Sequence, residues 1–181
     1  MITFDDLQIN GKTLDITIPS NTIVYLSQDL DLFSPQYVGH ILYKNFPIHN
    51  AKKSFLKKVF YEIKHNKTLE NNLSPEDNMK MFAEIFNSHC IWNVPLRYFS
   101  VSQHTVSVKN IDKETLIQLE VGLAMLSQEK VLLIRDIPQI TNTKAKERIK
   151  GIFEAKAQYS GEIIIYTGFN LDCESEIKIN L

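Results

Sequence analysis

Three short, almost uniformly apolar runs limit most strongly what this chain can fold into. They lie in Ile23–Leu26, Val131–Ile134 and Glu162–Thr167, and such runs are typical of strands that are buried on both faces of a sheet. Amphipathic helices are predicted at Lys113–Leu126 and Lys144–Ala157, before and after the second run. This succession of helix, strand, helix and strand with short links predicts parallel βαβ units.

The N-terminal residues predict antiparallel strands ahead of this parallel core. Ile2 and Phe4 alternate with polar neighbours, residues 10–11 are the Asn-Gly pair of a tight hairpin turn, and Thr13–Ile18 alternates cleanly. A short strand at Glu176–Leu181 is predicted to close the chain. The predicted class is therefore α/β, with an antiparallel part before the parallel one.

The middle of the chain is predicted to be mainly helical. Helices are expected at Gln36–Lys44 and Asn50–His65, and a third is expected from Ser74 to Phe86, with Pro at its first position. Residues 98–108 have a strand-like pattern. We expect one domain over the whole chain, with a helical subregion at about residues 50–97.

Composition indicates a globular domain and argues against several kinds of function. Of the 181 residues, 44% are apolar, and 20 basic and 21 acidic side chains give a net charge of −1. This balance provides no overall attraction to nucleic acid or to anionic lipid. No apolar run reaches the roughly 18–20 residues that span a bilayer, and the first residues lack the pattern of a secretory signal. A cytoplasmic location is therefore expected.

Cysteine and histidine usage predicts neither a disulfide framework nor a metal site. Cys90 and Cys173 show no CxxC spacing, and the five histidines never pair at metal-ligand spacing. No nucleophile–base pair or paired-carboxylate motif is apparent either. We therefore expect no metal, no cofactor and no catalytic residue.

The predicted order of elements resembles the nucleotide-binding domain of ABC transporters over nearly the whole chain. One stretch that carries the resemblance is Leu14–Leu26, a strand that ends in Ile-Pro, a turn, and the strand that precedes the phosphate-binding loop (P-loop). The other is Glu114–Leu126 followed by Lys130–Ile134, which looks like the helix after the ABC signature and the Walker B strand. The resemblance implies a P-loop NTPase-like fold, a mixed sheet with an N-terminal antiparallel part and a parallel βαβ core flanked by helices.

The residues at the place of the P-loop do not have the chemistry of such a loop. A P-loop needs glycines so that backbone N–H groups surround the phosphates, a Lys for the β- and γ-phosphates, and a hydroxyl for Mg²⁺. Ser27–Gln36 contains no Gly and no Lys, and Ser34 and Pro35 stand at the Lys and hydroxyl positions. Asp29 and Asp31 would repel a triphosphate. The resemblance therefore implies a degenerate Walker A motif.

Three further motifs that the resemblance implies are also altered. Ile111–Thr115, at the signature position, contains no glycine, and Gly168 stands where a His would sense the γ-phosphate. The Walker B position allows two registers. In one, Arg135 replaces the Mg²⁺-binding Asp and Asp136 stands at the catalytic Glu; in the other, Asp136 keeps the first role and Ile137 replaces the Glu. Neither register leaves the acidic pair that metal-assisted water attack requires.

The sequence thus predicts a pseudo-ATPase that acts as a protein-interaction or regulatory subunit of a membrane-associated, transporter-type complex. The expected partner is a membrane subunit, a second copy, or a paralogous ATPase in a dimer, which would bring the chain to the inner face of a membrane. The possible partner-binding residues, which would line a groove for a membrane subunit, are Phe86, Ile91, Trp92 and Leu96. Equally, this apolar segment could be part of the core.

A second interpretation comes from another class of protein. The same α/β succession occurs in AAA+ modules, so the chain could be a degenerate AAA+-like replication subunit that binds DNA or a replication protein. Its nucleic-acid surface would then consist of Lys44, Lys52, Lys53, Lys57 and Lys58. The near-neutral total charge favours a solvated helix face for these lysines instead.

Overall fold

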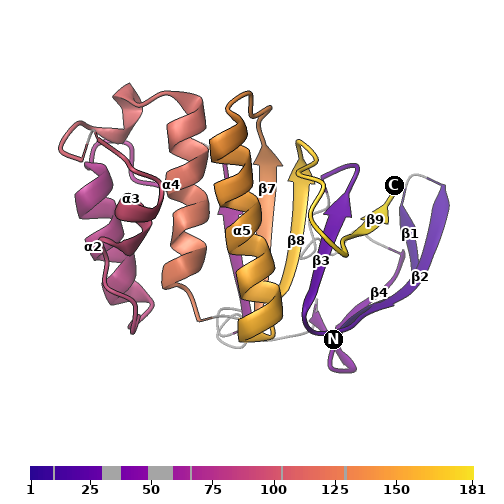
Figure 1. Cartoon of the computed structure of the whole chain (residues 1–181). Helices are drawn as coiled ribbons and strands as arrows, with labels where there is room; N and C mark the ends of the chain where they lie inside the picture. The colour runs from indigo at the N-terminus through magenta and orange to yellow at the C-terminus, as the bar shows by residue number, and fades with distance from the viewer. Residues whose placement is uncertain (10, 30–37, 49–58, 66, 103, 129) are drawn as a thin grey trace.

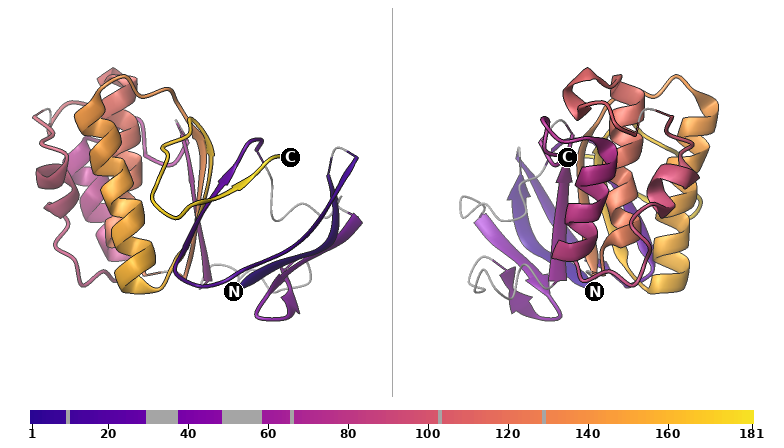
Figure 2. Two further views of the ribbon diagram at one scale, coloured as in Figure 1. Left: turned by 45° about the vertical axis from the view of Figure 1, so that its right-hand side comes forward. Right: turned by 90° about the vertical axis from the view of Figure 1, so that its left-hand side faces the viewer.

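The computed structural model describes the chain except for residues 10, 30–37, 49–58, 66, 103 and 129 (Figure 1). The described part has three layers, which the left view of Figure 2 shows most clearly. A parallel sheet lies in the middle, helices cover one of its faces, and an antiparallel sheet faces the other.

The central sheet contains five parallel strands in the order β6-β7-β8-β3-β9. Its strands are β6 (Phe60–Lys64), β7 (Val131–Ile137), β8 (Ile163–Gly168), β3 (Thr22–Leu26) and β9 (Ile177–Ile179). The three apolar runs predicted as buried strands are β3, β7 and β8, so that prediction is confirmed. Each is buried because alternate side chains pack into two different cores, one on each face of the sheet.

The second sheet contains four antiparallel strands in the order β2-β1-β4-β5. They are β1 (Ile2–Ile9), β2 (Lys12–Ile18), β4 (Val38–Tyr43) and β5 (Phe46–Pro47). The predicted N-terminal hairpin is confirmed as β1 and β2. Within the described residues the two parts form separate sheets that share a core, which includes Phe4, Ile18 and Val24.

The helices are α2 (Pro75–Ile85), α3 (Val94–Tyr98), α4 (Lys113–Leu126) and α5 (Thr143–Ser160). Ser74, Asp112 and Asn142 begin α2, α4 and α5 by accepting a hydrogen bond from the backbone N–H three residues later. The predicted helices at these places are confirmed. All four lie on the same face of the central sheet (Figures 1 and 2).

Two helix predictions are wrong because strand pairing overrides a local pattern. Of the helix predicted at Gln36–Lys44, residues 38–43 form β4, which pairs with β1. Of the helix predicted at Asn50–His65, residues 60–64 form β6, which pairs with β7. The buried residues Phe60 and Ile63 are spaced like a helix stripe, but the open edge of β7 provides a ladder of hydrogen bonds that a helix could not use.

The predicted strand at residues 98–108 is also wrong. Residue 98 ends α3 and residue 108 begins a short 3₁₀ helix, Val108–Asn110, and no described residue between them is in a strand. Of the predicted nucleic-acid surface, Lys44 lies in the turn between β4 and β5, and Lys52, Lys53, Lys57 and Lys58 lie outside the described residues. In the part of the chain that the structure describes, no helix is long and apolar enough to cross a membrane.

Candidate functional site

The carboxyl ends of the parallel strands are the place where an open α/β sheet normally binds its ligand. Five charged side chains gather at these ends, and we call them the carboxyl-edge cluster. They are Asp29, Glu62, Lys64, Arg135 and Asp136. They come from β6, from β7, and from the chain just after β3.

Arg135 is the centre of the carboxyl-edge cluster. Its Nε donates to Asp29 Oδ1 at 2.6 Å, its Nη2 donates to Asp29 Oδ2, and its Nη1 donates to Glu62 Oε1 at 2.5 Å. These hydrogen bonds, those to Asp29 above all, raise the pKa of Arg135 above its already high value. The side chain is only 15% exposed, so this bidentate pair is partly shielded from water. The guanidinium is therefore already bound by two carboxylates of its own chain.

The local sequence explains this arrangement. In β7, Leu133 packs into the core on the side of the antiparallel sheet, and Arg135 has the same orientation because side chains two residues apart share a face. Glu62 lies opposite Leu133 on β6. Asp29 belongs to the stretch where a P-loop would begin. Arg135 of β7 thus binds Asp29 in the segment after β3. In a P-loop, backbone N–H groups of this segment would surround the phosphates.

The stretch between β3 and β4 is also short. It consists of residues 27–37, and a loop of the form GxxxxGK[ST] takes about eight residues. Of this stretch, the structure describes residues 27–29.

Asp136 has an unusual backbone conformation and pairs with Lys64 rather than with Arg135. Its φ of 61° is rare for a residue other than glycine, and its N–H donates to Thr167 Oγ1 at 3.1 Å. Its carboxylate lies 3.6 Å from Lys64 Nζ and is about half exposed. The pairing of β7 with β8 shifts register beside it. The only carboxylate at the end of β7 is therefore engaged by a lysine.

Gly168, at the end of β8, leaves no space for the side chain that the family would place there. Its φ is 95°, and a Cβ would lie 2.3 Å from the carbonyl oxygen of Ile137. Its own carbonyl accepts a hydrogen bond from Tyr25 Oη at 3.1 Å. The neighbouring strand thus occupies the position from which a histidine would extend.

Sequence reasoning missed a buried acid–imidazole pair beside the cluster. His65 Nδ1 lies 2.7 Å from Glu120 Oε2, and the two side chains are 7% and 0% exposed. Burial, with a smaller contribution from Lys113, lowers the pKa of His65, so the neutral imidazole donates its Nδ1 proton to the carboxylate. The available signal was Glu120 itself, a charged residue within the apolar stripe of α4.

The four predicted partner-binding residues differ in exposure and do not all lie at one surface. Ile91 is 65% exposed and lines, with the partly buried Trp92, a hollow of about 540 Å³ next to α2. Lys80 Nζ lies 4.8 Å from the centre of the Trp92 ring. Phe86 packs behind the hollow, edge-on to Tyr61. Leu96 is 3% exposed and packs in the core, so it does not line this hollow.

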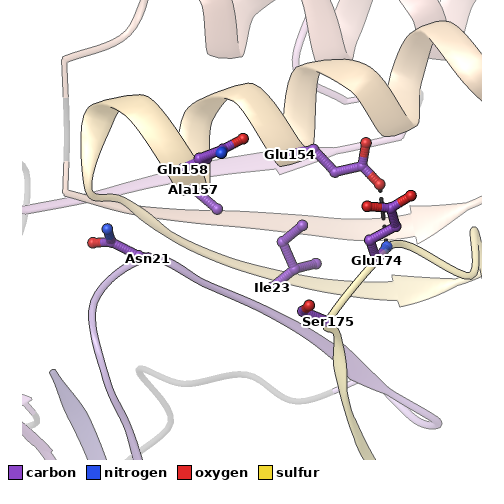
Figure 3. A pocket seen from close by; sticks show the side chains of 7 residues that line it. All are labelled: Asn21, Ile23, Glu154, Ala157, Gln158, Glu174 and Ser175. Atoms are coloured by element: carbon purple, nitrogen blue, oxygen red, sulfur yellow. Dashed lines mark hydrogen bonds between the residues drawn. The ribbon is translucent and has the colours of Figure 1, made fainter.

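A different hollow of about 370 Å³ lies between α5, the start of β3 and the loop before β9 (Figure 3). Figure 3 shows the carboxylates of Glu154 and Glu174 facing each other, and the Glu174 N–H donates to Glu154 Oε1 at 3.1 Å. Ser175 is the only hydroxyl among its lining residues, which include no histidine or cysteine. No group of three or more His, Cys, Asp or Glu among the described residues could hold a metal ion.

Comparison with known proteins finds similarity in structure alone. No protein-family model and no curated protein matches the sequence. Among solved structures, a putative ABC transporter ATP-binding protein from Pyrococcus furiosus matches with a TM-score of 0.75 and 14% identity, over 99% of this chain and 96% of that one. A subunit of the ABC transporter complex cbiONQ from Clostridium perfringens matches with a TM-score of 0.68 and 12% identity, over 96% and 80%.

A third similar structure is a dimeric ATP-binding cassette in a post-hydrolysis state, bound to ADP and phosphate. It matches with a TM-score of 0.76 and 10% identity, over 100% of this chain and 94% of that one. Identities this low establish a common fold and leave the activity open. The predicted P-loop NTPase-like fold, and the resemblance on which it depends, are confirmed at this level.

Proposed function

Because the chain has the fold of ABC transporter ATP-binding domains, we propose that it is a catalytically inactive domain of this type. In this proposal it acts as a protein-interaction or regulatory subunit of a membrane-associated, transporter-type complex. The observation that carries the proposal is the binding of Arg135 by Asp29 and Glu62. In the register that places Arg135 at the Mg²⁺-binding position, an arginine held in an internal ion pair stands where the family has an acid, and this supports the proposal.

The charges at the carboxyl edge support the absence of nucleotide binding. A triphosphate requires cations and backbone N–H groups in a concave arrangement. The carboxyl-edge cluster has three carboxylates for two cations, and both cations already have carboxylate partners. A nucleotide would have to displace Asp29 from Arg135 and approach Glu62 and Asp136, which costs electrostatic energy. The short connection at residues 27–37 offers no replacement for the missing lysine.

Thermal unfolding in the presence of millimolar Mg-ATP tests this proposal. A ligand that binds only the folded state must raise its melting temperature, so we expect no shift for this chain and a clear shift for an active ABC cassette measured in parallel. Arg135→Ala should show no shift either, because removing the internal cation does not provide a P-loop. A clear shift of the unmodified chain, or of Arg135→Ala, would contradict the proposal.

The same proposal assigns the chain a protein partner. One of the similar structures is a dimer, and another is described as part of a transporter complex. We therefore expect a membrane subunit, a second copy or a related ATPase to bind this chain. The hollow lined by Ile91 and Trp92 supports this, because it exposes a large aliphatic side chain next to an aromatic ring.

Co-purification from the membrane fraction of the source cell tests this partner site. Ile91→Asp places a charge on the exposed rim of the hollow and should reduce recovery of an integral membrane protein at least about tenfold, the effect of losing roughly 1.4 kcal/mol of binding. Trp92→Ala should act in the same direction. Phe46→Ala is the matched control, because Phe46 is equally exposed but belongs to the antiparallel sheet. Equal recovery with all variants would exclude this hollow as the docking site.

A further inference from the structure

β2 is an open edge of the antiparallel sheet. It is the first strand in the order β2-β1-β4-β5, and among the described residues only β1 pairs with it. Figure 1 shows it at the opposite end of the molecule from α2. Alternate residues of an edge strand direct their N–H and C=O groups away from the sheet. β2 therefore presents a row of hydrogen-bonding groups that fits one further strand.

β2 lacks the features that usually protect such an edge, which are shortness, proline, a bulge or a blocking lysine. The strand has seven residues, Lys12–Ile18, and none of them is proline. The extra residue that disturbs its pairing with β1 lies in β1, between Phe4 and Leu7. Lys12 could block the edge, but its Nζ donates to the carbonyl oxygen of Asn180 at 3.1 Å. The rest of the edge is therefore regular.

The two faces of β2 differ in their chemistry. Leu14 and Ile16 are partly buried and pack against the core between the two sheets, and Ile18 is fully buried in it. Asp15 and Thr17, on the outer face, are exposed. From residue 14 to residue 18 the strand therefore alternates apolar and polar side chains in the same order from either end.

This alternation makes β2 complementary to a second copy of itself in antiparallel orientation. With a two-fold axis at Ile16, Leu14 of each copy lies opposite Ile18 of the other, and Asp15 lies opposite Thr17. The apolar pairs join the two cores at the edge, and each Thr17 hydroxyl donates to an Asp15 carboxylate. No like charges lie opposite each other in this register.

The neighbouring registers are less favourable. An axis at Asp15 would place the two Asp15 carboxylates directly opposite each other, which is destabilising. An axis at Leu14 would place Lys12 opposite Ile16, on the face that packs against the core. The side chains of β2 thus select a partner strand and one register for it.

We propose that the chain forms a homodimer in which the β2 strands of two copies pair antiparallel about Ile16. The two antiparallel sheets then continue into each other, and backbone hydrogen bonds supply most of the affinity. An interface limited to one strand edge is small, so we expect a dissociation constant on the order of micromolar. The inference does not depend on the proposed function, because β2 and the helices beside Ile91 and Trp92 lie on opposite sides of the central sheet (Figure 2).

Sedimentation velocity of the full chain over about 1 to 100 µM tests the proposal, because a dimer of this affinity forms within that range. Thr17→Asp places a carboxylate opposite Asp15 and should weaken the dimer at least about tenfold. Combining it with Asp15→Lys places opposite charges across the axis and should restore the dimer. Thr3→Ala is the matched control: Thr3 Oγ1 lies 3.2 Å from Thr17 Oγ1 but belongs to β1, so this variant should dimerise normally. Circular dichroism and melting temperature establish that each variant is folded.

Disulfide cross-linking tests the register. Directly opposite residues of antiparallel strands have Cα atoms about 4.5–5.5 Å apart, a distance that a disulfide spans. Ile16→Cys should therefore give a covalent dimer under mild oxidation. Leu14→Cys should not, since the two copies of residue 14 would be about 13 Å apart, four residues along the strand. The unmodified chain, which contains Cys90 and Cys173, is the control.

Three outcomes would overturn the proposal. One is a monomer at every concentration, which would leave the edge open or available to a strand of another protein. Another is a dimer that Thr17→Asp does not weaken, since its interface would lie elsewhere on the molecule. The third is cross-linking of Leu14→Cys in place of Ile16→Cys. None of these results bears on nucleotide binding, so a failure here is distinguishable from a failure of the proposed function.

Discussion

Gly168→Ala is expected to destabilise the domain by about 3 kcal/mol, the sum of a positive-φ cost and an overpacking cost. At this position φ is 95°, and the new Cβ would lie 2.3 Å from the Ile137 oxygen and 2.5 Å from the Ile137 nitrogen. Both are backbone atoms of β7, a strand held between β6 and β8, so they cannot move aside without breaking the central sheet. Gly168→His would meet the same obstacle, so restoring the family's histidine does not restore its geometry.

Urea unfolding of Gly168→Ala next to Gly11→Ala measures this effect. Gly11 also has a positive φ, 77°, but a Cβ there would meet nothing within 4 Å. Its substitution should therefore cost only the conformational part, about 1 kcal/mol. If the two variants were equally stable, close contact with β7 could not be the reason for glycine at position 168.

His65→Ala is expected to cost a similar amount, about 3 kcal/mol, because it removes a hydrogen-bond partner of the fully buried Glu120 side chain and leaves a cavity. Glu120 is 0% exposed, so water cannot replace the imidazole. His65→Gln, which can still donate to Glu120, should lose clearly less stability. Replacing both residues by leucine should recover most of the loss, since an apolar pair of similar volume leaves no buried charge. Equal unfolding free energies for His65→Ala and His65→Gln would contradict this account.

The pair of His65 and Glu120 also makes the free energy of unfolding depend on pH, because the pKa of His65 is lowered in the folded state. Burial lowers the pKa of His65 in the folded state, while Asp136 raises it and Lys113 lowers it to smaller extents. As the pH falls below about 6.5, the unfolded chain takes up a proton at this residue that the folded chain does not. The free energy of unfolding should therefore decrease toward lower pH, by at most about 1.4 kcal/mol per unit. His65→Gln should lack this part of the slope.

The sequence was informative about elements with strong local patterns. β7 and β8 were predicted because strands of a parallel sheet are apolar on both faces, and α4 and α5 because each has an apolar stripe at helical spacing. β4 and β6 were not predicted. Their alternation is short and imperfect, and their partners β1 and β7 lie far away in the chain. The choice between helix and strand was therefore made by tertiary contacts.

For the candidate site, the sequence predicted only the missing phosphate-binding motif and not the contacts that the site contains. The absence of glycine and lysine from residues 27–36 can be read directly. The partner of Arg135 cannot, because Asp29 is 106 positions away and nothing local indicates the pairing. His65 and Glu120 are 55 positions apart, and the wrong helix at Asn50–His65 concealed that the histidine ends a strand facing α4. A missing motif can be recognised from neighbouring residues in the sequence. The side-chain pairs found in its place join residues that are far apart in the sequence, so they are known only from the fold.

The position of β3 between β8 and β9 has a consequence for how a cell makes this protein. Thr22–Leu26 leaves the ribosome early, but its neighbours in the central sheet begin at Ile163 and Ile177. At roughly 5–20 residues per second, synthesis takes on the order of ten seconds to reach them. During that time a strand meant to be buried on both faces has no partner, and such exposed apolar segments aggregate or recruit chaperones. The central sheet therefore closes only after β8 and β9 have left the ribosome.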